Sequence, residues 1–334
     1  MLLKIFATFI LLFFCFKIEF AFADSTDFRF EDRIRIRESM KIYNEIGEKV
    51  WKNSNDIPFA IILVTNKNEY LINLSNPTDD FKSLGYDSIV TSEVFVRPRQ
   101  FNNNLLATFP AVNGVSTIVV GLPENTSRSS MDWIVTILHE HFHQLQASKP
   151  DHYSDIDALN LRGDDKSGMW MLNYDFPYRD EKVNRQYKIL TQSAKKTYLS
   201  MDNLDFEINL NDYLDERKKF KELLSKKDYK YFSFQIWQEG FARYSEIKFA
   251  EFLIDFYTPS KELMKLNDYI SPDSFYTRIL NRLLRRADFQ DLANEKRDCF
   301  YTLGALEGLI LDKANPGWKD LYFKEKFFIE KYYK

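Results

Sequence analysis

The sequence has few of the residues that cross-link or divide a chain. Only two of its 334 residues are cysteines, Cys15 and Cys299, and it has ten glycines and ten prolines. No repeat, low-complexity tract or Gly/Ser-rich linker marks a domain boundary. If the chain is cleaved ahead of Asp24, Cys299 has no partner and no intramolecular disulfide can form. Stability then depends on burial of a core, for which the many Phe and Tyr residues supply apolar surface.

The sequence also lacks a large excess of either charge. It has 46 Lys and Arg against 49 Asp and Glu, and loss of Lys4, Lys17 and Glu19 with residues 1–23 leaves 44 against 48. A nucleic-acid-binding surface would show a strongly basic excess. The lysine-rich run at 216–227 contains acids at helical spacing, as a solvated helix face does. We therefore expect no nucleic-acid partner.

The only long apolar run lies at the N-terminus. It extends from Ile5 to Phe16, stops before Lys17, and is followed by the small residues Ala21 and Ala23 ahead of Asp24. A transmembrane helix needs about 20 apolar residues, more than this run provides. The pattern predicts a signal peptide over residues 1–23, cleaved after Ala23. We therefore expect the protein to be secreted or periplasmic and not to remain inserted in a membrane after cleavage.

The rest of the chain divides into a β-rich and a helical half. β-Branched and aromatic residues broken by turn formers predict a small, mostly antiparallel sheet between Phe59 and Leu122. Ser129 and Asp132 form a capping box for a helix from about Met131 to Ser148. Further helices are expected near residues 178–199, 210–227, 232–256, 273–286, 297–313 and 317–333. The prediction is an α+β fold with residues 24–148 and 149–334 as two halves of one unit.

Three of the four histidines lie in the stretch T-I-L-H-E-H-F-H-Q-L-Q at 136–146. His139, Glu140 and His143 form the pattern H-E-x-x-H. On a helix, residues four apart lie about 40° apart, so both imidazoles can bind one ion. Glu140 lies beside them and can take a proton from a water that the metal has made acidic. The pattern predicts His139 and His143 as metal ligands and Glu140 as a catalytic base.

The other two histidines have different surroundings. His141 lies about 160° around the helix from His139, on the side of Leu138 and Leu145. That position is typical of a hydrogen-bonded core histidine rather than of a ligand. His152 follows the helix in the loop-like context K-P-D-H-Y-S-D, where we expect a surface histidine, with entry into the cleft as the alternative.

A third ligand is suggested by the segment W-Q-E-G-F-A at 237–242. It resembles the W-x-E-G-x-A segment of the gluzincin metallopeptidases. The resemblance implies a zincin-like fold and a zinc ion held by His139, His143 and Glu239. Independently of the resemblance, Glu239, Arg243 and Glu246 share one face of a helix. We expect Glu246 to orient a histidine ligand or to hold Arg243 near the ion, and Glu239 itself to bind the metal.

Further along, the segment Y-T-L-G at 301–304 is similar to the Y-x-x-G segment of gluzincin aminopeptidases. The resemblance implies that the Tyr301 hydroxyl supports the oxyanion, with a packing tyrosine as the alternative. In zincins an edge strand pairs with the extended substrate, and Val115–Gly121 is the segment expected there, with an ordinary buried strand as the alternative.

Two features depart from the aminopeptidase pattern. The G-x-M-E-N strand is absent, and 95 residues separate His143 from Glu239, which predicts a helical insertion over the cleft. The remaining likeness, over residues 100–312, is to the broader peptidase MA-like group. The sequence predicts a zinc-dependent metallopeptidase acting on a peptide or protein. The alternatives are an aminopeptidase of the same clan and a non-catalytic zinc protein that binds a peptide or partner.

Overall fold

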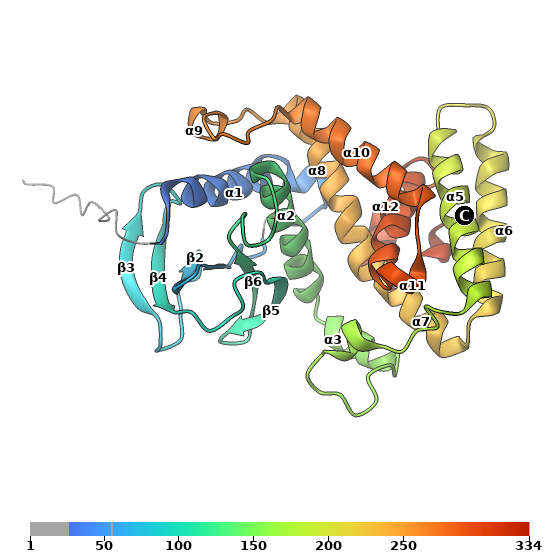
Figure 1. Ribbon diagram of the computed structural model, residues 1–334, viewed down its shortest axis with the longest axis horizontal. Coiled ribbons are helices and arrows are strands. Elements are labelled where there is room, and N and C mark those ends of the chain that lie inside the picture. The colour runs from blue at the N-terminus through green and yellow to red at the C-terminus, as the bar shows by residue number, and fades with distance from the viewer. Residues whose placement is uncertain (1–26, 55, 334) are drawn as a thin grey trace, which may run out of the picture.

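A computed structural model describes residues 27–54 and 56–333 (Figure 1). A six-stranded mixed sheet is followed by a large helical part, so the expected α+β class is confirmed. The predicted signal peptide, residues 1–23, lies outside the described residues. Within the described ranges, no helix combines the length and apolar character needed to cross a membrane.

The elements follow one another along the chain in two groups. The strands are β1 Ile61–Val64, β2 Asn68–Ile72, β3 Lys82–Asp87, β4 Ser92–Pro98, β5 Leu106–Val112 and β6 Val115–Gly121. The longer helices are α1 Phe30–Val50, α2 Ser130–Ala147, α5 Glu181–Leu199, α6 Phe206–Leu223, α7 Lys226–Gln235, α8 Phe241–Phe256, α10 Pro272–Asp288 and α12 Asp298–Ala314. The short elements are α3 His152–Ala158, α4 Trp170–Asn173, η1 Ile236–Gly240, α9 Lys261–Met264, α11 Leu292–Glu295, α13 Lys319–Tyr322 and η2 Ile329–Tyr332.

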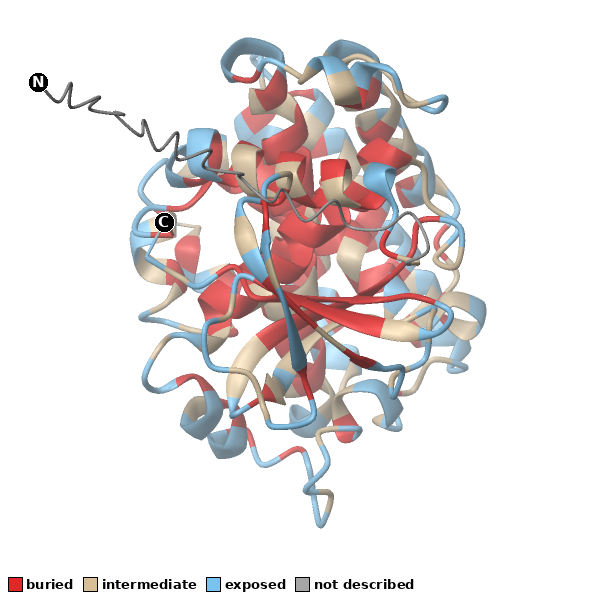
Figure 2. Ribbon diagram, turned by 90° about the vertical axis from the view of Figure 1, so that its left-hand side faces the viewer, coloured by how far each residue is buried: buried red, intermediate tan, exposed pale blue. Residues whose placement is uncertain are grey.

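The sheet has the strand order β3-β4-β2-β1-β6-β5. Strands β1 and β6 run parallel, and the other neighbouring pairs are antiparallel. Alternate residues face opposite sides, so Ile61 and Leu63 join the main core while Ile62 and Val64 join a smaller cluster on the other face. Figure 2 shows the buried residues concentrated in the central strands and in the helices behind them.

This strand order corrects one expectation. Val115–Gly121, expected at the edge of the sheet, is strand β6 and has a partner on each side. The reason is tertiary: β1 pairs in parallel with β6, with Ile61 opposite Ile118, and leaves β5 outermost. The free edge of this end of the sheet therefore belongs to Leu106–Val112.

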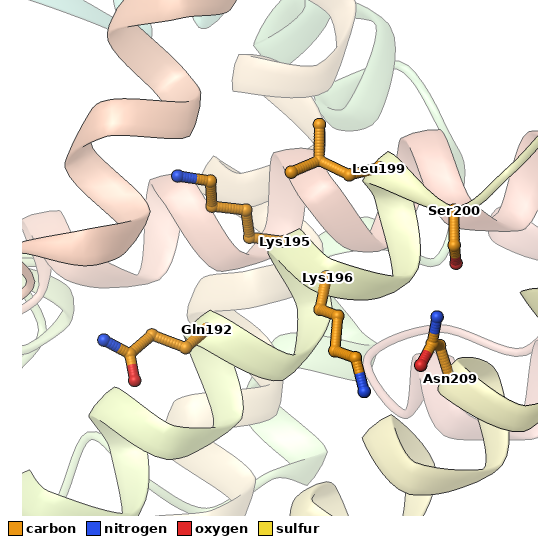
Figure 3. A pocket seen from close by; sticks show the side chains of 6 residues that line it. All are labelled: Gln192, Lys195, Lys196, Leu199, Ser200 and Asn209. Atoms are coloured by element: carbon orange, nitrogen blue, oxygen red, sulfur yellow. The ribbon is translucent and has the colours of Figure 1, made fainter. Parts of the chain in front are cut away.

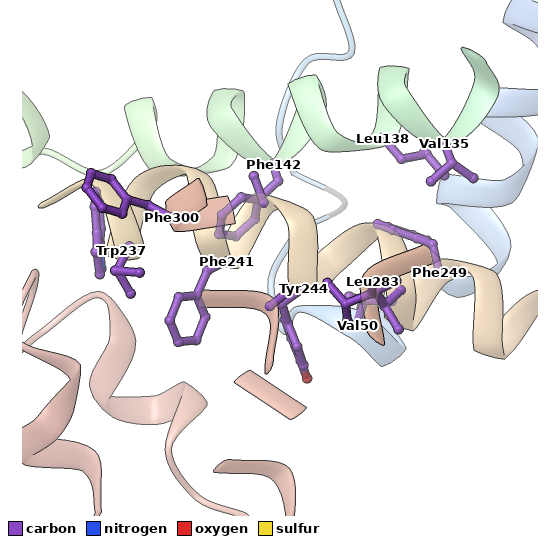
Figure 4. Packing of buried hydrophobic residues seen from close by; sticks show 14 of the residues in the cluster. Val50, Val135, Leu138, Phe142, Trp237, Phe241, Tyr244, Phe249, Leu283 and Phe300 are labelled. Atoms are coloured by element: carbon purple, nitrogen blue, oxygen red, sulfur yellow. The ribbon is translucent and has the colours of Figure 1, made fainter. Parts of the chain in front are cut away.

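Helix α2 forms where its sequence predicts it. Ser129 caps its N-terminus by accepting a hydrogen bond from the Asp132 amide. The carboxylate of Asp268 adds a second cap, since it lies 2.7 Å from both the backbone nitrogen and the hydroxyl of Ser130. The apolar face of α2, which includes Leu138 and Phe142, packs against α8 (Figure 4).

Helix α1 is absent from the sequence-based prediction. Its segment R-I-R-I-R at 33–37 alternates charged and apolar residues, as an exposed strand does. In the structure Ile34, Ile42, Ile46 and Val50 are buried on one helical face, and α1 packs against α2 and α8. The β-rich first half of the chain therefore also supplies a long helix to the core.

The predicted helix over residues 317–333 is wrong. Only the turns α13 and η2 form there, and Phe327 between them has a left-handed φ of 74°, which a helix excludes. Trp318, Tyr322 and Tyr332 are each buried in the core. Burial of these aromatic rings, rather than helical periodicity, determines the path of the segment.

Candidate metal centre

Helix α2 carries three of the predicted site residues on adjacent turns. His139 and Glu140 are each 6% exposed, and His143 is half-buried. The Nε2 atoms of His139 and His143 lie 3.2 Å apart, as expected for side chains four residues apart on one helix face. The two imidazoles thus point toward the same volume.

Glu239 approaches these histidines from the second half of the chain. Its Oε2 lies 3.6 Å from His139 Nε2 and 3.4 Å from His143 Nε2. Glu239 belongs to η1, a π-helical turn between α7 and α8, whereas the sequence predicted one uninterrupted helix over residues 232–256. Such π-helical turns are frequent at functional sites. The three side chains form a possible metal-binding triad.

The Nδ1 atom of each histidine is held by a neighbouring side chain. His139 Nδ1 lies 2.7 Å from Glu246 Oε1, and His143 Nδ1 lies 2.7 Å from Gln146 Oε1. Both oxygens only accept hydrogen bonds, so each ring carries a proton on Nδ1, and in its neutral form each ring then has its Nε2 lone pair on the side of Glu239. This tautomer is the one that a metal ligand requires.

Gln146 connects α2 to the π-helical turn. Its Nε2 lies 3.3 Å from the carbonyl oxygen of Trp237 and 2.8 Å from the Tyr322 hydroxyl, which in turn donates to the same carbonyl. These donors satisfy a carbonyl of the irregular turn. Gln146 and Tyr322 were not predicted from the sequence, although Gln146 lies three residues after His143, a spacing that places the two on one helix face.

The electrostatics of the cluster favour a cation. Burial opposes the protonated form of His139, but hydrogen bonds to Glu239 and Glu246 outweigh it and raise the pKa of His139 to about 9. Burial opposes the charged form of Glu239, yet His143 and His139 hold the pKa of Glu239 well below its usual range. The carboxylates therefore attract positive charge to the point where the two Nε2 atoms meet.

Glu246 and Arg243 lie where the helix spacing placed them. Glu246 is buried, and while its Oε1 meets His139, its Oε2 accepts a hydrogen bond from Arg243. The arginine thus compensates the buried carboxylate that fixes the ring of His139.

Glu140 faces the edge strand. The Thr108 hydroxyl on β5 lies 2.9 Å from both the backbone oxygen and the Oε2 of Glu140. The Thr108 hydroxyl therefore connects β5 to Glu140, the residue that follows His139 on α2. Thr108 was missed because the strand order, not the local pattern, brings β5 to α2.

Tyr301 lies beside the triad on α12. Its ring stacks on that of His139, with centroids 6.1 Å apart and an interplanar angle of 10°. Arg297 donates to the Tyr301 hydroxyl over 2.8 Å and also lies 3.9 Å from Glu239 Oε1. Burial and the Glu239 carboxylate raise the pKa of Tyr301 well above its usual range, so its hydroxyl stays protonated. Arg297, four residues before Tyr301, was not anticipated from the sequence.

The two remaining histidines lie outside the triad. His141 is fully buried, as expected, and stacks on Phe59 while its Nδ1 contacts Gln144 Oε1. His152 was expected at the surface but is only 7% exposed, because it packs near Trp237 beneath the π-helical turn. Burial is the main cause that lowers the pKa of each to about 4.

The insertion between His143 and Glu239 mainly supports the helical part. Its α5–α6 hairpin packs on α12 and α10, far from the sheet, rather than over α2 (Figure 1). Near the site, Tyr231 and Gln235 of α7 donate to the Met171 carbonyl over 2.9 and 2.8 Å. The segment before α5 is thereby fixed to the helix that leads into Glu239.

A separate, open surface pocket of about 290 Å³ lies along the hairpin (Figure 3). It is lined by Gln192, Lys195, Lys196, Leu199, Ser200 and Asn209. These residues come from α5, α6 and the turn after α5, and none of them belongs to the triad. The pocket is therefore distinct from the metal centre.

Comparison with known proteins adds no further assignment. No protein-family model, no curated protein and no solved structure matches the chain significantly.

Proposed function

We propose that the protein is a zinc-dependent hydrolase with a zincin-like site of the gluzincin type, and that it cleaves peptide bonds. The observation that carries the proposal is the convergence of His139, His143 and Glu239, with both Nδ1 atoms engaged and both Nε2 atoms directed at one point. Two imidazoles and a carboxylate form a ligand set of catalytic zinc sites, which leave a fourth position for water or substrate.

The donor separations support zinc as the ion. Zinc bound by nitrogen and oxygen at about 2.0–2.2 Å in a tetrahedron places its donors roughly 3.4 Å apart. The three separations in the triad are 3.2, 3.4 and 3.6 Å. When bound, zinc supplies Lewis-acid chemistry by acidifying water and polarising a carbonyl.

The chain's own residues supply the proton transfers. Glu140 lies next to the triad, where its carboxylate accepts a proton from the attacking water and passes it to the leaving amine. The Thr108 hydroxyl restrains that carboxylate. Tyr301, kept protonated, donates to the oxygen that becomes negative as the carbonyl is attacked, with Arg297 holding its hydroxyl in place.

An extended peptide suits the edge strand beside this site. The free edge of β5 offers backbone groups for pairing with an added strand, and Thr108 of the same strand contacts Glu140. In the aminopeptidase alternative, Glu246 receives the substrate's amino group. Both of its oxygens already bind His139 and Arg243, which disfavours that role.

The decisive experiment compares purified wild-type protein with the Glu140→Gln variant. We expect about one zinc per chain in both, and hydrolysis of a mixed-peptide digest only by the wild type. Glu222→Gln, at an exposed position of α6, is the matched control and should keep full activity. Turnover retained by Glu140→Gln would remove Glu140 from the role of base, and full activity without metal would remove the whole proposal.

We also propose secretion or periplasmic export, which rests on the N-terminal pattern alone. Intact-mass measurement on exported protein should give a chain that begins at Asp24. Recovery of residues 1–23 in a membrane fraction contradicts this.

A further inference from the structure

Five arginines surround the candidate site, and four of them are paired with acids. Arg243 pairs with Glu246, and Arg297 lies near Glu239. The Asp132 carboxylate on the first turn of α2 is shared by two arginines of α10, Arg278 at 2.8 Å and Arg282 at 3.3 Å. Among the described residues, the fifth arginine, Arg128, makes no side-chain hydrogen bond or ion pair.

Arg128 lies in the loop that joins β6 to α2. Since Leu106 pairs with Val120, this loop follows the end of β6 that lies beside the first residue of β5. The Arg128 guanidinium is within electrostatic range of Glu246, Asp132 and Glu140. It therefore lies at the end of the site toward the N-terminus of α2.

The Arg128 guanidinium has a buried N–H group that no atom of the described residues accepts. Its Nε is buried without a hydrogen-bond partner, and burial lowers the pKa of the guanidinium. A buried charged donor without a partner is costly, and such groups usually bind a ligand or a counter-charge. Of the three acids within electrostatic range, Asp132 and Glu246 bind other arginines, and Glu140 contacts the Thr108 hydroxyl.

We propose that Arg128 binds a carboxylate of the substrate, so that the enzyme prefers peptides with a negative charge on the side that faces the start of β5 and of α2. This inference rests on the proposed function. The planar guanidinium suits bidentate contact with a carboxylate. The carboxylate belongs either to an acidic side chain or to a free C-terminus.

The test measures binding without turnover, on full-length zinc-loaded Glu140→Gln protein. The probes are rhodamine-labelled hexapeptide pools built from uncharged residues. One pool has a free C-terminal carboxylate, one has an amidated C-terminus with a single Glu, and one has an amidated C-terminus with a single Gln. Fluorescence anisotropy should show one acidic pool binding about tenfold or more tightly than the Gln pool. The pool that gains identifies the source of the carboxylate.

Variants in the same background assign the preference to Arg128. Arg128→Gln should bind all pools about equally, whereas Arg128→Lys should keep part of the preference. Arg286→Gln is the matched control, since Arg286 pairs with Glu295 at the surface and should not affect selectivity. A preference that survives in Arg128→Gln, as when the carboxylate binds only the zinc, overturns the inference.

Two further outcomes separate this inference from the proposed function. Absence of any preference in the Glu140→Gln protein overturns the inference whether or not the Arg128 variants fold. A protein that discriminates between the pools but whose wild type hydrolyses nothing contradicts only the proposed function.

Discussion

Gly240 and Gly304 are in backbone contact where the π-helical turn η1 meets α12. A Cβ atom on Gly240 would lie 2.6 Å from the Cα of Gly304, and one on Gly304 would lie 2.5 Å from the Cα of Gly240. Gly240 directly follows Glu239, and Gly304 lies one turn after Tyr301. The close approach of the two glycines is therefore what brings Tyr301 next to Glu239.

The contact predicts that alanine is not tolerated at either glycine. Alanine would gain helix propensity over glycine, by up to about 1 kcal/mol. The backbone clash should outweigh this gain, because overpacking a core costs typically about 1–3 kcal/mol. We expect Gly240→Ala and Gly304→Ala to lower the free energy of unfolding in urea, and to lower activity further by moving Tyr301.

Gly317 provides the control for this prediction. Its added Cβ would meet nothing closer than 3.6 Å, so Gly317→Ala should change the free energy of unfolding by less than about 0.5 kcal/mol. Equal stability of all three variants would show that the helices can separate at no cost.

The two glutamates of the Glu239 helix face should differ in their effect on zinc binding. Glu239 lies near the Nε2 atoms of both histidines, whereas Glu246 contacts only one of the two histidines, at His139 Nδ1. Loss of a residue that orients a ligand typically costs about 10- to 100-fold in metal affinity, and loss of a ligand costs more. Zinc titration of Glu239→Ala and Glu246→Ala, with folding checked by circular dichroism, should show the larger loss in Glu239→Ala. The reverse order would make the ligand assignment wrong.

Gln146 offers a test of how His143 is oriented. Gln146→Leu removes the acceptor for His143 Nδ1 and the donor to the Trp237 carbonyl, so zinc affinity should fall about 10- to 100-fold. Gln146→Glu keeps an acceptor for His143 Nδ1, loses the donor and adds a negative charge. Competition with a chromophoric chelator should therefore rank zinc affinity as wild type, then Gln146→Glu, then Gln146→Leu. If both variants lose affinity equally, support of the π-helical turn matters more than the orientation of His143.

The parts of the site that local sequence predicts are those set by one helix. Helix geometry alone places His139 and His143 on one face, and the capping residue Ser129 locates the start of that helix. Helix spacing likewise predicted that Glu239, Arg243 and Glu246 share one face, but the π-helical turn at Glu239 was not predicted. A core position for His141 followed from its angle around α2.

The parts that were missed depend on contacts between distant segments. The edge strand was misassigned because no local pattern specifies which neighbour β6 takes. Helix α1 was not predicted because its arginines alternate with isoleucines, as in a strand. Some of these arginines pair with acids from other parts of the fold, as Arg33 does with Asp87. His152 was placed at the surface because its sequence resembles a loop, whereas the last residues of the chain cover it: Lys326 pairs with Asp155 of the same short helix.

Burial of His152 predicts a specific sensitivity to acid. Burial, together with the charges of Lys326 and His143, lowers the pKa of His152 to about 4 against the opposing effect of Asp155. In the unfolded chain the pKa is about 6.5. Between these values the unfolded state binds a proton that the folded state excludes, so the free energy of unfolding falls as the pH falls from about 6.5 to 4. At pH 5 the loss attributable to His152 is about 2 kcal/mol.

Replacing His152 with phenylalanine removes the titratable nitrogens and so isolates the contribution of His152 to the acid-induced loss of stability. His152→Phe keeps an aromatic side chain near Trp237, while His141 and the triad histidines, His139 and His143, titrate in both proteins. Urea unfolding of metal-free wild-type and His152→Phe protein at pH 7.5 and pH 5 should show a smaller acid-induced loss in the variant, by about 2 kcal/mol. An equal loss in the two proteins would mean that His152 accepts a proton in the folded state, and hence that solvent reaches it beneath the π-helical turn.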